Sequence, residues 1–296
     1  MPQYYAETQG VKPLIMPVVK HGDGRFETDS TPIILALEST ADTARSILTD
    51  NPVIKFLIFL IEDFADEWLT KCVFHYRFSY EADRDYGPKW VMDDAHPQAT
   101  TSEIASLSSA FLQRQTERMP LVGCTPGNAP ILEQSFQKLL EILEPFVGLE
   151  KFLFGTRPSL ADFGLFGQLK TLATDPTPHN IIRTMAPRLE HWTQRIDDLS
   201  GVDGQFSTLQ DLDEATRQLS EFAAGIYLPY LRANYNAYQE GKDSLELEIL
   251  DQHYTQPVFK YQVKCFEKLR QYYNALSASS RETLRERFAI NGESFA

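Results

Sequence analysis

The sequence is poor in cysteine and has no long apolar run. Its three cysteines, Cys72, Cys124 and Cys265, are odd in number and far apart, which excludes a disulfide framework and the paired spacing of a zinc site. The longest uninterrupted apolar run, residues 56–61, has six members, whereas a helix needs about 20 apolar residues to cross a bilayer. We therefore predict a protein with no structural disulfide, no metal and no membrane span.

Positive charge is also scarce in this chain. Its 28 Lys and Arg residues face 41 Asp and Glu residues, giving a formal charge of −13. Such a chain repels a phosphate backbone and has no basic surface from which counterions could be released, so we predict no nucleic-acid partner. The first ten residues, MPQYYAETQG, have neither the basic nor the apolar region of a signal peptide. Together with the cysteine usage, these absences predict a cytoplasmic location.

What the sequence does contain is mainly helical periodicity, after a short mixed segment. Residues 11–38 read as a β-type run (LIMPVV), a turn (HGDG), a second strand (RFETD) and a short helix (STPIILALE). A polar stretch ends at Pro52, and dense apolar spacing then predicts a long, largely buried helix over residues 53–78. Gly, Pro and acidic residues predict a solvated loop over residues 79–97. Further helices are predicted over residues 99–118, 131–146, 187–196, 206–239, 259–276 and 281–289, and a short strand or loop over 244–250.

A proline interrupts the stretch FLFGTRPSLADFGLFGQL, residues 152–169, directly before Ser159. Ser159 and Asp162 have the spacing of a capping box. In that motif the serine side chain accepts a hydrogen bond from the amide of the third helical residue, and the acidic side chain reaches back to the serine amide. The helix that they open is apolar on nearly every face until Lys170, so we predict that it is buried.

This capping box, the FLFG before it and the P-R-L-x-x-W-x-x-R-I after it resemble the helical C-terminal domain of the glutathione transferase superfamily. The segment MPVVKHGDGRFETDSTPII is similar to the second half of that superfamily's thioredoxin-like domain. The fold class that this implies is mostly α, with a partial thioredoxin-like α/β lobe (hairpin plus helix) before the helical domain. The implied organisation is a partial lobe over residues 1–40, a linker over 41–50, a helical domain over 51–200 and a helical extension packed on it over 201–296.

The resemblance implies a glutathione site in the small lobe, with glutathione as the co-substrate. Met16-Pro17 matches the cis-proline motif whose first residue offers backbone hydrogen bonds to the cysteinyl part of glutathione. Asp29 and Ser30 match the acidic residue and serine that hold the γ-glutamyl end at a helix N-terminus. The competing interpretation is plain helix capping by Asp29 or Ser30, with Pro17 as an ordinary proline at the start of a strand.

The front of the chain departs from the family pattern. Few residues precede Met16-Pro17, and the first strand, first helix and second strand of a thioredoxin-like lobe have no counterpart. Either the chain is truncated at its N-terminus, which is the preferred hypothesis, or the lobe is a remnant. The Tyr, Ser or Cys that activates the thiol in this superfamily therefore has no match, and the catalytic residue is unknown at this point.

The long helix carries the candidates for an electrophile pocket, because in the superfamily that helix borders the pocket. Lys71 and His75 lie one turn apart, with Tyr76 adjacent. A base or hydroxyl there would steer a thiolate or polarise an acceptor. The competing interpretation places Tyr76 in the core and pairs Lys71 with Glu67, one turn away.

Two other features of the sequence have a structural interpretation. Glu62, Asp63, Asp66 and Glu67 lie at helical spacing, but a di-metal site would also need Glu-x-x-His motifs, which the sequence lacks. We therefore interpret them as a solvated face, and predict no metal. Cys124, in the turn-rich GCTPG, is expected to be the most exposed cysteine, yet it has no basic neighbour to lower its pKa. We interpret it as structural.

Two functions remain open from the sequence. The first is an enzyme that binds glutathione and conjugates it to a small electrophile. The second is a non-catalytic binding or scaffold protein with the same fold, which fold-level analogy does not separate from the first. The implied partners are a small-molecule thiol and an electrophile, together with a second copy of the chain, because dimers are usual in the superfamily.

Overall fold

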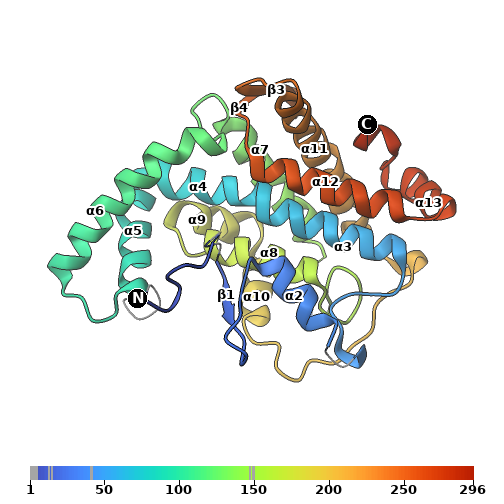
Figure 1. The fold of residues 1–296 in the computed structure, drawn as a ribbon, viewed down its shortest axis with the longest axis horizontal. Coiled ribbons are helices and arrows are strands. Elements are labelled where there is room, and N and C mark those ends of the chain that lie inside the picture. The colour runs from blue at the N-terminus through green and yellow to red at the C-terminus, as the bar shows by residue number, and fades with distance from the viewer. Residues whose placement is uncertain (1–5, 13, 15, 41–42, 147, 149–150) are drawn as a thin grey trace.

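The structure, a computed structural model, describes residues 6–296 apart from 13, 15, 41–42, 147 and 149–150. The chain is mostly helical and opens with a short antiparallel hairpin (Figure 1). Strands β1 (Val18–Lys20) and β2 (Phe26–Thr28) pair with Val19 opposite Glu27. Helix α2 (Ser30–Glu38) follows directly. The hairpin and helix expected at the start of the chain are therefore confirmed.

The long helix predicted over residues 53–78 is also confirmed. It consists of three segments in succession, α3, a π-helical turn and α4 (Pro52–Phe64, Ala65–Leu69 and Thr70–Ser79). The Asn51 side chain caps its first turn by accepting hydrogen bonds from two backbone amides, at 3.0 and 3.1 Å. Nearly every α3 residue is buried, as expected of a helix that is apolar on all faces. π-Helical turns are rare and frequently lie at functional sites.

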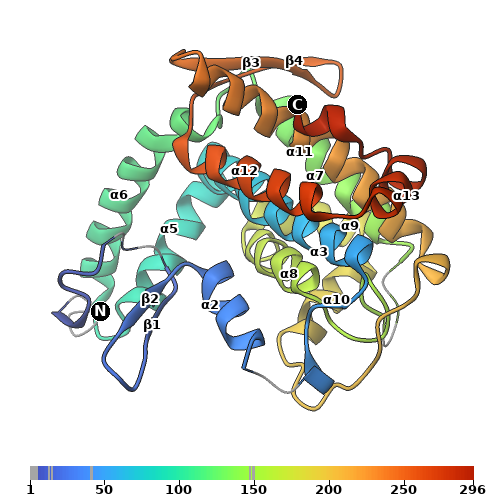
Figure 2. The ribbon, with the colours of Figure 1, turned by 45° about the vertical axis from the view of Figure 1, so that its right-hand side comes forward.

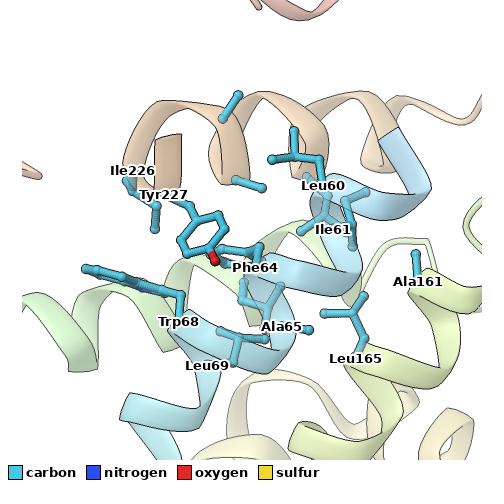
Figure 3. Close-up of a cluster of buried hydrophobic side chains, with 14 of the residues drawn as sticks. Leu60, Ile61, Phe64, Ala65, Trp68, Leu69, Ala161, Leu165, Ile226 and Tyr227 are labelled. Atoms are coloured by element: carbon cyan, nitrogen blue, oxygen red, sulfur yellow. The ribbon is translucent and has the colours of Figure 1, made fainter. Parts of the chain in front are cut away.

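Helix α8 (Leu160–Leu172) packs against α3 in the interior, as the sequence predicts. Figure 3 shows its Leu165 beside Ala65 of the π-helical turn. The predicted capping box at its start is formed, and both of its side chains are fully buried. A Cβ atom on Gly164 would lie 3.3 Å from the Glu62 backbone, so the small residue permits this close approach of the two helices.

The prediction of a solvated loop over residues 79–97 is wrong, because most of this segment forms helix α5 (Glu81–Ala95). Gly87 and the proline after it are buried in the middle of that helix. A Cβ atom on Gly87 would lie 3.0 Å from both Arg77 Cγ and Asp175 Oδ1. Close packing therefore outweighs the low helix propensity of Gly and Pro at this point.

Four more helices surround this centre. Helices α6 and α7 pack on α4, α9 packs on α5 and α7, and α10 packs on α8 and α9. No helix in the described part of the chain combines the length and apolarity that a bilayer crossing requires. The bounds of these four helices are Thr101–Arg118 (α6), Ala129–Leu143 (α7), Pro176–Met185 (α9) and Pro187–Ile196 (α10).

The last third of the chain adds helices and a second hairpin to the same hydrophobic core. Helices α11 and α12 both pack on α3, and Figures 1 and 2 show α12 running along it. The ring of Tyr272 on α12 stacks on Phe59 of α3 at 4.5 Å. Residues 244–249 are a strand, one of the two outcomes left open by the sequence. The elements are α11 (Glu214–Gln239), β3 (Ser244–Ile249), β4 (Gln252–Pro257), α12 (Lys260–Ala275) and α13 (Ala278–Phe288).

Candidate functional site

A cavity of about 490 Å³ lies where the β2–α2 junction, α3 and α12 meet. Its volume is typical of small-molecule sites. Its walls bring acidic and basic groups together, and its charged and phenolic lining residues are Asp29, Glu62, Asp63, Tyr261, Lys264, Lys268 and Tyr272. A wider depression of about 890 Å³ is lined by α11, the turn that follows it and β3, and more than half of its lining residues are exposed. The cavity beside α3 is therefore the candidate site.

A backbone hydrogen bond of Asp29 connects the two segments that the sequence predicts to bind glutathione. The Met16-Pro17 bond is cis, as predicted, and the Asp29 amide donates a hydrogen bond to the Pro17 carbonyl at 3.1 Å. Met16 is 64% exposed. Asp29 has a φ of 79°, a left-handed conformation that is strained for a residue with a Cβ and that recurs at functional sites. Ser30 begins α2 and is half-buried, but it does not line the cavity.

The competing interpretation of Asp29 as a plain helix cap is wrong. Asp29 occupies the N-cap position of α2, but its side chain makes no capping hydrogen bond. Its Oδ2 atom accepts a hydrogen bond from the Tyr261 hydroxyl at 3.1 Å instead. The Asp29 carboxylate therefore faces α12 across the cavity.

The acidic side chains of α3 form the floor of the cavity, so the predicted solvated face is wrong for Glu62. Glu62 is only 8% exposed and accepts a hydrogen bond from the Thr31 hydroxyl at 2.9 Å. Asp63 accepts one from the Tyr227 hydroxyl at 2.8 Å. Burial raises the pKa of Glu62 to about 7 and that of Asp63 well above its ordinary value. Only Asp66 keeps the exposure that the sequence suggested.

Helix α12 supplies the basic and aromatic wall, which the sequence analysis missed. Six of its side chains line the cavity, at the i, i+3, i+4, i+7 spacing that places residues on one face of a helix. Lys264 and Lys268 are exposed at the rim, and Lys268 Nζ lies 4.9 Å from the centre of the Tyr272 ring. The helical spacing of these residues is present in the sequence, but no motif near them indicates that this face of α12 meets α3. The six residues are Tyr261, Lys264, Cys265, Lys268, Leu269 and Tyr272.

The three electrophile-pocket candidates do not line this cavity. Lys71, His75 and Tyr76 are 2%, 4% and 1% exposed. Lys71 Nζ donates to the Val122 carbonyl at 3.0 Å and to Gln256 Oε1 at 2.8 Å, in place of the expected pair with Glu67. Burial lowers the pKa of Lys71 to about 8. These contacts join α4 to the loop before α7 and to β4, which is a structural role.

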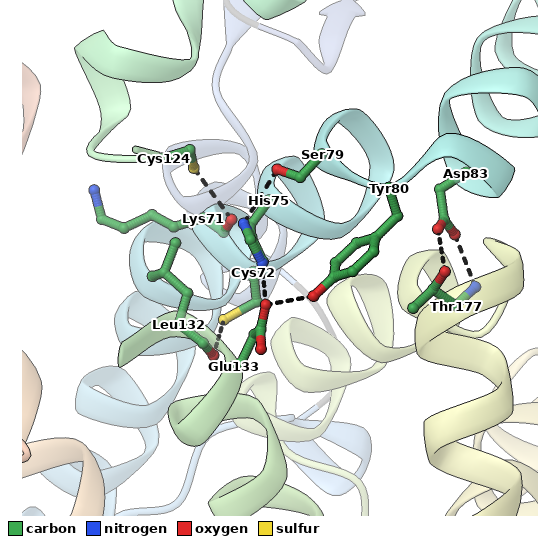
Figure 4. A network of polar contacts seen from close by, with 10 residues as sticks. All are labelled: Lys71, Cys72, His75, Ser79, Tyr80, Asp83, Cys124, Leu132, Glu133 and Thr177. Atoms are coloured by element: carbon green, nitrogen blue, oxygen red, sulfur yellow. Dashed lines mark hydrogen bonds and ion pairs between the residues drawn. The ribbon is translucent and has the colours of Figure 1, made fainter. Parts of the chain in front are cut away.

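Tyr76 and Cys124 are both core residues. The Tyr76 ring packs edge-on against Phe136 at 5.3 Å, which agrees with the competing interpretation of this residue. The predicted exposure of Cys124 is wrong, because it is 4% exposed and its thiol donates to the Lys71 carbonyl at 3.3 Å. Burial raises the pKa of the Cys124 thiol to about 12. His75 belongs to a separate polar network with Ser79, Tyr80 and Glu133 (Figure 4).

The raised pKa of Glu62 gives a testable pH dependence of stability. The pKa of this carboxyl is about 7 in the folded protein and about 4.3 in the unfolded chain. The protonated carboxyl therefore stabilises the fold below pH 4, and this contribution is lost as the pH rises through 7. The Glu62→Gln change keeps the acceptor for Thr31 and removes the charge. We expect the variant to match the wild type near pH 4 and to exceed its free energy of unfolding by about 3–4 kcal/mol at pH 8.

Urea denaturation at both pH values measures this difference. The change Glu141→Gln, at an exposed surface position, is the control and should alter stability by less than about 0.5 kcal/mol at either pH. An equal effect of Glu62→Gln at pH 4 and pH 8 would contradict the assignment of the raised pKa to this carboxyl.

The cavity offers charged groups for a polar ligand but no assembled metal site. Among the residues that the structure describes, no group of three or more His, Cys, Asp or Glu side chains is placed to hold a metal ion. Comparison of the chain with protein-family models, with curated proteins and with solved structures finds no match. The function is therefore inferred from the residues and geometry of the cavity.

Proposed function

We propose that the cavity between α2, α3 and α12 binds a zwitterionic peptide thiol, with glutathione as the ligand. The observation that carries this proposal is the placement of opposite charges on different walls of one cavity. The glutathione transferase-like fold implied by the sequence gives the same ligand. Binding of a small thiol at this place is common to both functions left open by the sequence.

The charges of the cavity are complementary to those of glutathione, which carries one ammonium group and two carboxylates. Asp29 is positioned to accept a hydrogen bond from the ammonium group, and hydrogen bonds between charged groups are the stronger ones. The Glu62 carboxyl lines the same cavity. Lys264 and Lys268 at the rim are positioned to meet a carboxylate. The apolar faces of Phe59 and Tyr272 would contact the peptide between its charged ends.

Conjugation would additionally require a group that stabilises the thiolate. The cavity contains a hydroxyl and a thiol of its own, Tyr261 and Cys265, but burial raises the pKa of both, so both stay protonated. The nearby carboxylates oppose the formation of a further negative charge. This favours the second candidate function, a protein that binds glutathione without turning it over.

Asp29→Asn is the direct test of ligand binding. Asparagine keeps the size of the side chain, tolerates a positive φ and still accepts the Tyr261 hydrogen bond, but it lacks the charge that an ammonium group needs. We expect the affinity for reduced glutathione to fall about 10- to 100-fold, because hydrogen bonds to charged groups contribute about 1.5–3 kcal/mol. Isothermal titration calorimetry measures the change.

The matched control is Asp23→Asn, in the exposed hairpin turn outside the cavity, which should leave the affinity unchanged. Absence of binding by the wild-type chain at millimolar glutathione, or equal binding by Asp29→Asn, would overturn the proposal. If the wild-type chain binds glutathione, conjugation of a reactive aryl halide would identify an enzyme. Binding without conjugation would identify a binding protein.

A further inference from the structure

A second group of polar side chains lies at the C-terminal end of α4, outside the cavity. His75 Nε2 lies 2.8 Å from Glu133 Oε1, and His75 Nδ1 lies 3.2 Å from Ser79 Oγ. Figure 4 shows the imidazole between the serine and the carboxylate. A hydroxyl, an imidazole and a carboxylate, hydrogen-bonded in this order, form the arrangement that activates a serine nucleophile. This arrangement is recognised by its geometry and by the roles of its groups, whatever their positions in the chain.

The hydrogen bond to Glu133 fixes the protonation of the imidazole. A carboxylate accepts hydrogen bonds and cannot donate them, so His75 Nε2 carries the proton. In neutral imidazole the other nitrogen then has a free lone pair, which leaves Nδ1 to accept from Ser79. The Tyr80 hydroxyl also donates to Glu133 Oε1 and helps to fix that carboxylate. The imidazole is thus held in the tautomer that a general base requires.

Ser79 differs from other helical serines of this chain. Ser106, Ser108, Ser135 and Ser220 each donate to the carbonyl four residues earlier, at 2.6–3.2 Å, which is the usual bond of a helical serine. Ser79 instead meets the side chain of the residue four positions earlier. Ser79 is exposed while His75 is 4% exposed, so the nucleophile is open to solvent and its base is shielded.

The chain after Ser79 supplies groups that can stabilise a developing oxyanion. Helix α5 begins at Glu81, two residues later, and the Tyr80 side chain at its N-cap makes no capping hydrogen bond. The first amides of a helix have no acceptor within the helix, and backbone amides of this kind stabilise tetrahedral intermediates of acyl transfer. The exposed Glu81 and the overall charge of −13 disfavour anionic substrates.

We propose that Ser79, His75 and Glu133 form a second site, which hydrolyses small uncharged carboxylic esters. Ser79 Oγ forms a bond to the ester carbonyl carbon while its proton passes to His75 Nδ1. The bond to the alcohol oxygen then breaks, and the leaving alcohol takes that proton. Water attacks the acyl-serine in the same way, which releases the carboxylic acid and restores Ser79. Glu133 acts through His75 and is a positioning residue.

A fluorophosphonate with an uncharged alkyl chain tests the site, because it labels only activated serines. We expect one labelled serine, identified as Ser79 by peptide mass spectrometry, and hydrolysis of p-nitrophenyl acetate. Ser79→Ala, a surface change, should abolish the label and lower the hydrolysis rate about 100-fold or more. Ser106→Ala, at another exposed helical serine, should change neither, and circular dichroism verifies that each variant is folded.

Glu133→Gln separates positioning from structure. The glutamine amide can donate to Nε2 and so favour the wrong tautomer, and we expect a lower kcat and slower labelling with an unchanged KM. Absence of label on Ser79 in the wild-type chain would overturn the proposal. So would labelling and hydrolysis that persist in folded His75→Gln or Ser79→Ala protein. Neither outcome bears on glutathione binding in the cavity.

Discussion

Replacing Asp162 by alanine is expected to lower the free energy of unfolding by about 3–5 kcal/mol. The Asp162 carboxylate is fully buried. It accepts hydrogen bonds from the Leu153 amide at 2.9 Å, the Ser159 amide at 2.8 Å and the Ser159 hydroxyl at 2.6 Å. Alanine would leave three buried donors without an acceptor, and each such group costs about 1–3 kcal/mol. Guanidinium denaturation of the two proteins measures the loss.

Two matched variants separate the hydrogen bonds from the helix cap. Asp162→Asn keeps one acceptor oxygen and should lose about half as much stability as the alanine variant. Glu103→Ala removes the corresponding side chain of the exposed capping box at the start of α6 and should cost only about 1 kcal/mol. A loss of about 1 kcal/mol for Asp162→Ala would show that burial adds nothing to this cap.

Replacing Arg77 by methionine is expected to be as severe, with a loss of about 3–5 kcal/mol. Arg77 Nε donates to Asp175 Oδ2 at 2.7 Å, and the Asp175 side chain is completely buried. Burial raises the pKa of Asp175, and the bond to Arg77 opposes that shift. Methionine fills the space of the arginine stem but leaves the carboxylate without a counterion.

The double variant Arg77→Met with Asp175→Leu tests the cause of that loss. Buried ion pairs replaced by apolar side chains of similar volume often cost little or nothing. We therefore expect the double variant to recover most of the stability lost by Arg77→Met, as measured by the denaturant midpoint and slope. A double variant less stable than Arg77→Met alone would show that Asp175 contributes through its place at the start of α9 and not through the charge pair.

The candidate site shows where prediction from sequence stops. Asp29 is a candidate because the segment MPVVKHGDGRFETDSTPII resembles part of a glutathione transferase, and that resemblance lies within one short stretch of the chain. Glu62 was misinterpreted as solvated, since its spacing on α3 is equally compatible with an exposed face. Its burial depends on α2, whose Thr31 lies 31 residues earlier, and on α12. The α12 wall was missed because its partner Asp29 lies 232 residues away.

By itself the sequence determined the local elements: the hairpin and α2, the long buried helix, and the capping box that opens α8. These depend on spacing, capping and apolar periodicity within one or two helical turns. Only the tertiary structure decided that residues 81–95 are helical, that acidic side chains of α3 line a cavity, and that His75 meets Glu133, 58 residues away. The physical reason is that burial and charge pairing depend on the packing of distant segments, and local propensity does not encode that packing.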